Sequence, residues 1–397
     1  KKVITQKKIN KFFNKTMENP FMLSSSVVSS SYEKIARAFA FGWAGAVMKT
    51  ITYINITEFS PRYDVIKDRI GTFTEFKNIE QLSQNTPEHD MDVIHKLKKN
   101  YPNKIVIASI MGRNEKEWAK LAKMAQSAGA DAVELNFSCP NMEEKDTGSA
   151  IGQNPAAVYK FTKVVKKAIK IPVLAKLTPN VVNMYDAAKA AHDAKADGIS
   201  AINTIKSIMT PRGKKCNAIS CVGGLSGAGV KPIGLRFIAE IRGCKEFNKM
   251  YISAIGGIES PRDALDYLSL GANNLQITTA VMQYGYRIIE PLINGLLYYM
   301  ECNHIKKVSD SESLGIKNIK PLDCVERGYV IYPKFDRSKC IKCGRCYISC
   351  QDGGHAAIVR DANGWPVCDL KKCVGCHLCT FVCPQQAITT SKVKAKK

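Results

Sequence analysis

Eight short apolar runs alternate with helical stretches along the first 300 residues of this 397-residue chain, and two four-cysteine runs follow them. The first pattern predicts an α/β fold, a TIM (β/α)8 barrel. The second predicts a two-[4Fe-4S] bacterial ferredoxin-like domain behind the barrel. A chain of this length exceeds one average domain and accommodates a large barrel with a small module.

The apolar runs are nearly continuous, as is typical of strands whose two faces are both buried in a parallel sheet. They lie at 21–26, 46–51, 105–110, 132–137, 173–178, 199–203, 252–256 and 275–279. Helical patterns follow the strands, for example at 115–128, 156–169, 185–196 and 262–270. A doubly wound sheet is the alternative, but no Gly-x-Gly-x-x-Gly run follows the first strand.

Polar residues stand where these strands end, which is the catalytic face of a parallel barrel. They include Lys49 and Thr50, Asn136 to Cys139, Lys176, Asn203 and Thr204, Gly256 and Gly257, and Thr278 and Thr279. A lysine within an apolar strand, such as Lys176, is costly to bury unless an anion meets it. We therefore expect the active site at this end of the barrel.

The last two strand ends suit a flavin. Gly256, Gly257 and Thr279 lie where barrels bind phosphate through backbone amides. Lys176 is the candidate cation beside a reduced flavin ring, and Lys49 could take the same role. The glycine pair by itself has an alternative interpretation as a tight turn.

Cys139 is the candidate general acid, because it lies on a loop at the catalytic face. A buried structural thiol is the alternative. Asn136, Asn203 and Thr204 favour catalysis, since an Asn amide offers both a donor and acceptors to a cyclic imide or amide. Asn78 is a further candidate for substrate binding.

The two cysteine runs have the ligand spacing of two-cluster ferredoxins, in which the fourth cysteine of each run binds the other cluster. The predicted metal ligands are Cys340, Cys343, Cys346 and Cys350, followed by Cys373, Cys376, Cys379 and Cys383. Zinc and disulfides are the alternative interpretations of these cysteines. Zinc sites usually use paired Cys-x-x-Cys motifs rather than four-cysteine runs, and disulfides would need an oxidising compartment, so the cluster interpretation is favoured.

The sequence also predicts the domain boundaries. We expect a barrel with an N-terminal extension over 1–303, a connector over 304–335, the cluster domain over 336–390 and a basic tail over 391–397.

Cluster ligation and scattered cysteines indicate a reducing, cytoplasmic location. We see no signal peptide and no apolar run long enough to span a membrane. The formal net charge is +23, with lysines at both ends. A solvated surface is favoured over an acidic partner protein, and nucleic acid is unlikely because aromatic residues are not interleaved with the basic ones.

The run Asn136-Phe137-Ser138-Cys139-Pro140 resembles the class 1 dihydroorotate dehydrogenases and the dihydropyrimidine dehydrogenases. The cluster domain points to the second group, and the chain resembles the catalytic, FMN-binding subunits of its bacterial NAD-dependent members from Asn19 to Ala387. The resemblance implies reduction of uracil or thymine, with Cys139 protonating C5. Asn78, Asn136, Asn203 and Thr204 would hold the pyrimidine, and FMN would contact Ser25, Lys49, Lys176, Gly224, Gly257 and Thr279.

No second dinucleotide-binding unit is visible, so NADH electrons are expected to arrive through an FAD- and NAD-binding flavoprotein subunit in a hetero-oligomer. Three other functions compete. Dihydroorotate oxidation would require a cation for the substrate carboxylate, and the cluster domain argues against it. A tRNA dihydrouridine synthase would need an RNA-binding domain where the cysteine runs lie. A plain electron carrier leaves the polar strand ends unexplained.

Overall fold

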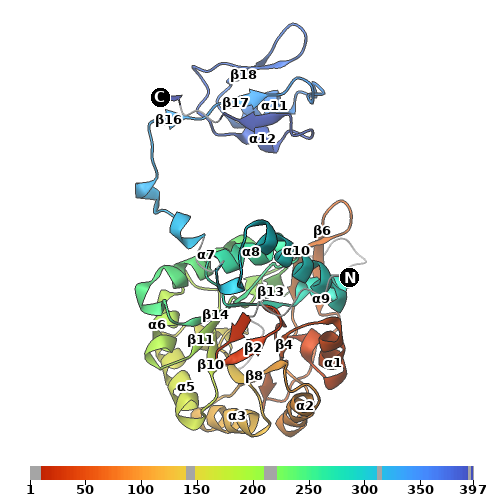
Figure 1. Ribbon diagram of the computed structural model, residues 1–397, viewed down its shortest axis with the longest axis vertical. Helices are drawn as coiled ribbons and strands as arrows, with labels where there is room; N and C mark the ends of the chain where they lie inside the picture. Colours follow the sequence, from red (N-terminus) through yellow and green to blue (C-terminus); the bar gives the residue numbers. More distant parts are fainter. Residues whose placement is uncertain (1–9, 140–147, 210–220, 311–314, 392–394, 397) are drawn as a thin grey trace. The chain divides into compact units, whose positions relative to one another are not determined.

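The computed structural model describes residues 10–139, 148–209, 221–310, 315–391 and 395–396. The chain divides into two compact units, Lys1–Ile319 and Lys320–Lys397 (Figure 1). The division falls inside the expected connector over 304–335. The four-part division made from the sequence stays a prediction.

The first unit is a closed parallel barrel, which confirms the predicted fold. Its strands are β3 (Phe21–Leu23), β4 (Gly45–Val47), β8 (Ile105–Met111), β9 (Ala132–Asn136), β10 (Val173–Lys176), β11 (Gly198–Ala201), β14 (Tyr251–Ile255) and β15 (Asn274–Ile277). They pair in the order β4-β3-β15-β14-β11-β10-β9-β8, and β4 pairs with β8 to close the sheet. A short strand, β5 (Ile51–Thr52), adds to the end of β8. Every residue of β8, β9 and β10 is buried, which explains their continuous apolar character.

A helix follows each strand and packs outside the barrel (Figure 1). These helices are α1 (Tyr32–Phe41), α2 (Pro87–Asn100), α3 (Glu115–Ser127), α5 (Pro155–Ala168), α6 (Tyr185–Asp193), α7 (Lys231–Gly243), α8 (Pro261–Ser269) and α10 (Ile289–Cys302). Local sequence sets several starts. Thr86, Asn114, Asn154 and Ser260 cap α2, α3, α5 and α8 with their side-chain oxygens. Such caps satisfy amides that have no partner within the helix.

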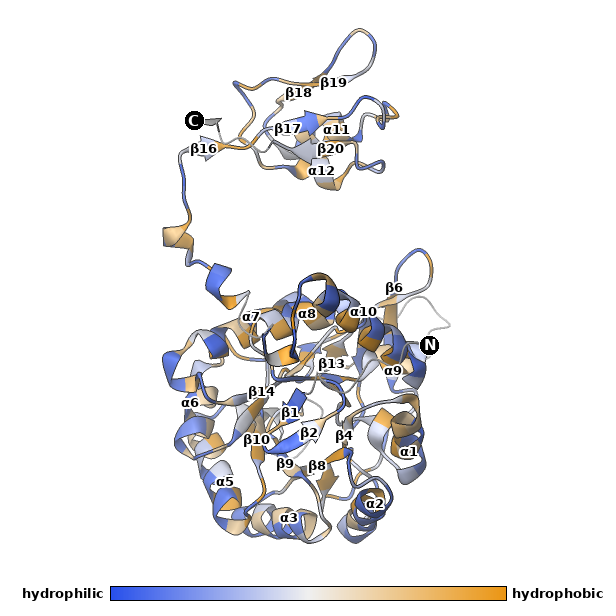
Figure 2. Cartoon of the chain, viewed as in Figure 1, coloured by the Kyte–Doolittle hydropathy of each residue, from blue (hydrophilic) through white to orange (hydrophobic). Residues whose placement is uncertain are grey.

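The amino end of the barrel is closed by a hairpin of β1 (Asn10–Phe12) and β2 (Lys15–Met17). Phe12 and Met17 are buried in one apolar cluster with Met22, Val47 and Ile107 of the barrel strands. The hairpin is mostly hydrophilic, whereas barrel strands such as β8 and β14 are hydrophobic (Figure 2). The polar pocket described below lies at the opposite, carboxyl end of the barrel.

Two of the loops at the carboxyl end carry a second sheet that the sequence did not predict. It is antiparallel, in the order β12 (Ile205–Ser207), β13 (Gly223–Ser226), β7 (Phe73–Asn78) and β6 (Tyr63–Lys67). β6 and β7 follow β4 and β5 in the chain, and β12 and β13 follow β11. Since β6 has no fully buried residue, its sequence lacks the apolar run by which the barrel strands were recognised.

The second unit consists of short elements around the cysteine runs: β16 (Tyr329–Val330), β17 (Pro333–Phe335), α11 (Arg345–Gly353), β18 (Ile358–Arg360), β19 (Pro366–Cys368), α12 (Leu378–Phe381), β20 (Ile388–Thr390) and β21 (Ala395–Lys396). β17 pairs with β20 from the other end of the unit. The two runs turn alike, because the residues on either side of each second cysteine have positive φ. These are Lys342 (56°) and Gly344 (76°) in the first run, and Gly375 (70°) and His377 (59°) in the second.

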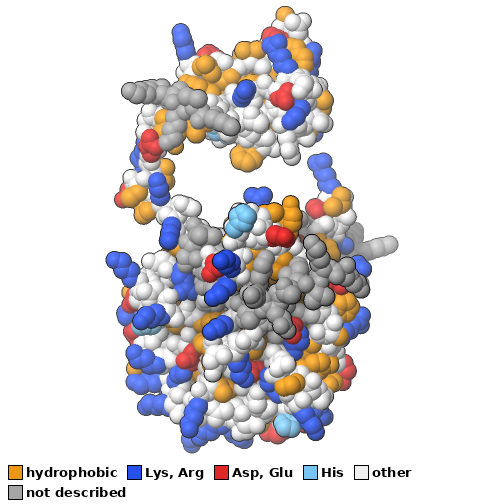
Figure 3. All heavy atoms as spheres, in the orientation of Figure 1, with side chains coloured by type: hydrophobic (Ala, Val, Ile, Leu, Met, Phe, Trp, Pro, Cys, Tyr) orange, Lys and Arg blue, Asp and Glu red, His pale blue; other side chains and the backbone are white. Residues whose placement is uncertain are grey.

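Lys and Arg side chains are scattered over the visible face of the barrel unit (Figure 3). This distribution is typical of a solvated charged surface. Within the ranges that the structure describes, no helix is both long and apolar enough to cross a membrane.

Candidate functional site

A pocket of about 1100 Å³, including its open mouth, lies at the carboxyl ends of the barrel strands. It gathers every predicted site residue of the barrel except Gly224. The predicted residues that line it are Ser25, Lys49, Asn78, Asn136, Cys139, Lys176, Asn203, Thr204, Gly256, Gly257, Thr278 and Thr279. Gly224 is not among the lining residues; it lies on β13, where its carbonyl accepts a hydrogen bond of 3.1 Å from the Asn78 amide.

Cys139 lies three residues beyond the end of β9 and is buried, with 7% of its surface exposed. It is one of the residues that line the pocket. Residues 140–147, which follow it, lie outside the described part of the chain. Its role as the general acid stays a prediction.

Asn136 and Asn203 are held together on neighbouring parts of the pocket wall. The Asn203 amide donates to Ser138 Oγ at 2.7 Å and to Asn136 Oδ1 at 3.4 Å. The Asn136 amide in turn donates to Thr50 Oγ1 at 2.9 Å. These bonds fix the orientation of both amides.

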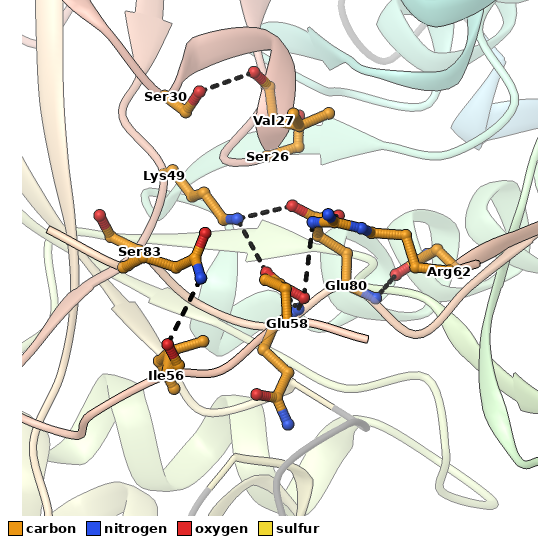
Figure 4. A network of polar contacts seen from close by, with 12 residues as sticks. Ser26, Val27, Ser30, Lys49, Ile56, Glu58, Arg62, Glu80 and Ser83 are labelled. Carbon is orange, nitrogen blue, oxygen red and sulfur yellow. Dashed lines mark hydrogen bonds and ion pairs between the residues drawn. The ribbon is translucent and has the colours of Figure 1, made fainter. Parts of the chain in front are cut away.

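Lys49 lies just beyond β4 and is clamped between two carboxylates (Figure 4). Its Nζ is 2.6 Å from Oε1 of Glu80 and 3.1 Å from Oε1 of Glu58. Arg62 joins the group, with its Nη1 3.3 Å from Oε2 of Glu80 and 3.8 Å from Oε2 of Glu58. The Tyr63 hydroxyl donates to Glu80 Oε2 at 2.7 Å. We name these five residues the Lys49 cluster.

The Lys49 cluster shifts the ionisation of its members. Burial raises the pKa of Glu80, but the hydrogen bond and charge of Lys49, with Tyr63 and Arg62, outweigh burial and hold the pKa below its usual value. Burial, followed by the hydrogen bond to Glu80 and its charge, raises the pKa of Tyr63. Glu80 is therefore a carboxylate and Tyr63 a neutral phenol at neutral pH.

Lys176, at the end of β10, meets the anion that its position requires. Its Nζ lies 3.2 Å from Oε1 of Glu134 on the neighbouring strand β9, and the two side chains are 4% and 0% exposed. Gln276 donates to Oε2 of Glu134 at 2.9 Å and to Ser253 Oγ at 2.8 Å. A chain of buried polar groups therefore crosses the barrel interior beneath the pocket.

The part of the pocket next to β14 is a narrow glycine turn. Gly256 and Gly257 have φ of 127° and 65°. A Cβ on Gly257 would lie 2.7 Å from the Cβ of Lys231. Beside the turn, Thr279 begins the short helix α9 (Thr279–Tyr284), and its hydroxyl is 2.9 Å from that of Ser226. Glycine is therefore required at 257, and the backbone here is accessible to a ligand.

The cysteines of the second unit group across the two runs. Cys340, Cys343, Cys346 and Cys383 line one pocket of about 470 Å³. Cys368, which lies outside both runs, is close enough to Cys350, Cys373 and Cys379 for the charges of their thiolates to affect it. This grouping is compatible with the predicted crossed ligation, in which each fourth cysteine serves the other cluster.

Among the residues that the structure describes, no group of three His, Cys, Asp or Glu side chains could hold one metal ion.

Sequence reasoning missed the partners of the predicted lysines, which are Glu58, Glu80, Arg62 and Tyr63 around Lys49, and Glu134 and Gln276 around Lys176. Glu134 and Gln276 left a signal, because each is a polar residue within an apolar strand. Glu58 left none, since it lies outside any helix or strand.

Residues 8–300 match the dihydroorotate dehydrogenase family, and residues 334–390 match the 4Fe-4S dicluster domain. The chain is 46% identical over 387 residues to the NAD-dependent dihydropyrimidine dehydrogenase subunit PreA of Escherichia coli, covering 96% of this chain and 94% of that protein. It is 33% identical to the chloroplastic dihydropyrimidine dehydrogenase (NADP(+)) of Arabidopsis thaliana, covering 74% and 73% of the two chains.

The catalytic subunit of dihydroorotate dehydrogenase B (NAD(+)) from Pyrococcus horikoshii is 36% identical, and the match covers 97% of that protein but 77% of this chain. Among solved structures, dihydroorotate dehydrogenase from Eimeria tenella in complex with ferulenol superimposes with a TM-score of 0.67. That match has 18% identity and covers 77% of this chain and 88% of the other. At this identity the structural match concerns the fold alone.

Proposed function

The chain belongs to the dihydroorotate dehydrogenase family, and from this premise we propose that it is the catalytic subunit of an NAD-dependent dihydropyrimidine dehydrogenase. The reaction reduces uracil or thymine at the C5–C6 double bond to the 5,6-dihydropyrimidine. The observation that carries the proposal is the similarity to the Escherichia coli subunit, which extends over both units and nearly the full length of both chains.

The pocket suits FMN. Backbone amides at Gly256 and Gly257, with Thr278 and Thr279, would hold the phosphate at this end of the pocket. Lys49 and Lys176 would lie at the flavin ring, with Ser25 as a further contact. Gly224 stays a predicted contact, although it does not line the pocket. When bound, the flavin supplies a hydride to C6 of the pyrimidine.

The residues of this chain would supply the proton and hold the ring. Cys139 gives its thiol proton to C5, so that a hydride and a proton together saturate the double bond. Asn78, Asn136, Asn203 and Thr204 match the alternating N–H and C=O groups of a cyclic imide, which needs no charged partner. The bonds that already hold Asn136 and Asn203 favour a fixed ring orientation.

The second unit would carry electrons through two [4Fe-4S] clusters bound by the eight cysteines of the runs. NADH would be used only through an FAD- and NAD-binding flavoprotein subunit, in a hetero-oligomer. The reduction of each pyrimidine then consumes one NADH and one further proton. Thiolate-bound clusters fit a reducing cytoplasm.

Dihydroorotate oxidation is the second candidate, supported by 36% identity to an archaeal dihydroorotate dehydrogenase subunit. It would require a cation for the substrate carboxylate, and both lysines of the pocket are paired with carboxylates. A dihydrouridine synthase is less favoured, because a 4Fe-4S dicluster domain occupies residues 334–390.

Anaerobic purification and stopped-flow mixing test the proposal. We expect about eight irons and one FMN per chain. NADH should leave the flavin of the isolated chain oxidised, and a flavoprotein subunit should restore uracil reduction. Zinc in place of iron, or rapid flavin bleaching by NADH without a partner, would refute the scheme.

A further inference from the structure

We propose that Glu80 and Glu58, by neutralising Lys49, make the pocket select uncharged pyrimidines over pyrimidines that carry a ring carboxylate. This inference rests on the proposed function and names what would set its substrate range. Glu80 and Glu58 are specificity-determining residues in this proposal, since they act through Lys49.

The cations at the pocket are compensated. Among the described residues that line it, the lysines and arginines are Lys49 and Lys176. Lys49 contacts two carboxylates and Lys176 contacts Glu134, and their side chains are only 10% and 4% exposed. Among the described lining residues, the lysines that a substrate carboxylate would meet are therefore already paired with carboxylates of the protein.

The charges of the Lys49 cluster cancel, since Lys49 and Arg62 are balanced by Glu58 and Glu80. Lys176 and Glu134 cancel in the same way, and Glu259 adds a further acidic group to the pocket wall. A ring carboxylate would add an uncompensated negative charge to a partly buried site, which is unfavourable. An uncharged imide avoids that cost.

Lys49 cannot easily leave its carboxylates to meet a substrate. Glu80 is held on its other oxygen by Tyr63 and Arg62, and its backbone amide donates to Asn78 Oδ1 at 3.2 Å. Glu58 accepts the Gln81 amide at 3.1 Å. If Lys49 moved, two carboxylates would lose a close cation. The link from Glu80 to Asn78 also connects the Lys49 cluster to a predicted pyrimidine contact.

The test is calorimetric titration of the FMN-loaded, full-length protein with uracil and with the pyrimidine carboxylate orotate. In Glu80→Gln, Lys49 loses one anionic partner, and the orotate-to-uracil affinity ratio should rise by about tenfold or more. The rise should disappear in Lys49→Met/Glu80→Gln. Glu58→Gln should give a smaller rise in the same direction, and it replaces Glu80→Gln if that variant does not fold.

Glu115→Gln is the matched control, because it breaks a Lys–Glu pair of 2.8 Å with Lys160 on the surface and changes the net charge equally. Its affinity ratio should match the wild type. An unchanged ratio in Glu80→Gln and Glu58→Gln, or a rise that survives Lys49→Met, would overturn the inference. If the ratio rises as expected but no variant reduces uracil, the charge assignment stands and the proposed function fails.

Discussion

The barrel unit and the cluster unit hold their functional groups in different ways. The barrel pocket assembles side chains from residue 24 to residue 282, and its lysines are buried against carboxylates. The cluster unit holds its thiols in short loops, and many of them remain partly exposed. The barrel site therefore depends on long-range packing, whereas the cysteine runs depend on local turns.

This difference implies that the two sites can be damaged separately. A change in a cysteine loop should leave the barrel folded, because the two units are compact by themselves. A change in the pocket should leave the clusters intact. The following predictions test that separation, from the largest expected effect to the smallest.

Cys350→Ala should abolish turnover driven by NADH and the partner subunit. In the crossed arrangement it removes a ligand of the cluster held by Cys373, Cys376 and Cys379. Iron content should fall toward about four per chain while bound FMN is retained. Selective loss of the other cluster, seen by electron paramagnetic resonance, would contradict the crossed arrangement.

Cys139→Ala should slow pyrimidine reduction by about 10²–10⁴-fold, because the proton donor at C5 is missing. FMN and iron content should remain at wild-type levels, and a chemical reductant should still reduce the flavin. Rapid-reaction measurement of flavin reoxidation by uracil gives the rate. A normal rate would mean that another group is the acid.

Lys176→Met should lower the free energy of unfolding by about 3–5 kcal/mol, since it leaves Glu134 buried without its cation. Urea unfolding of the full-length protein, followed by fluorescence, measures the change. The double variant Lys176→Met/Glu134→Gln should recover part of the loss. Lys160→Met, which breaks an exposed pair with Glu115, should cost at most about 1 kcal/mol. Equal losses of unfolding free energy in Lys176→Met and Lys160→Met would show that the buried pair stabilises the protein no more than the exposed pair does.

The pH dependence of stability should carry a smaller contribution from Glu80. Its pKa in the folded protein is below the ordinary value of 4.5, so the unfolded chain binds more protons as the solution is acidified. The stabilisation from Glu80 is complete above pH 4.5 and is lost as the pH falls through the lowered value. Glu80→Gln should therefore show a shallower loss of stability than the wild type as the pH falls below 4.5 in urea unfolding. An unchanged slope would mean that Glu80 is not held as a carboxylate by the Lys49 cluster.

The sequence by itself determined the features that depend on local pattern. Continuous apolar runs identified the barrel strands, because a strand buried on both faces has no polar positions to interrupt it. Polar residues at the ends of those runs placed Lys49, Asn136 and Lys176 at one end of the barrel, since parallel strands end on the same side. Cysteine spacing likewise indicated the dicluster domain, because short loops set which thiols can share a cluster.

Only the tertiary structure decided which groups meet. Glu58 and Glu80 reach Lys49 from segments that carry no apolar period, and Gly224 meets Asn78 because β13 pairs with β7. The pairing of Lys176 with Glu134 depends on the register of β9 against β10. Local sequence patterns report the face and element on which a residue lies. The charge that a residue finds there depends on segments far away in the chain, and in this pocket those segments neutralise both lysines.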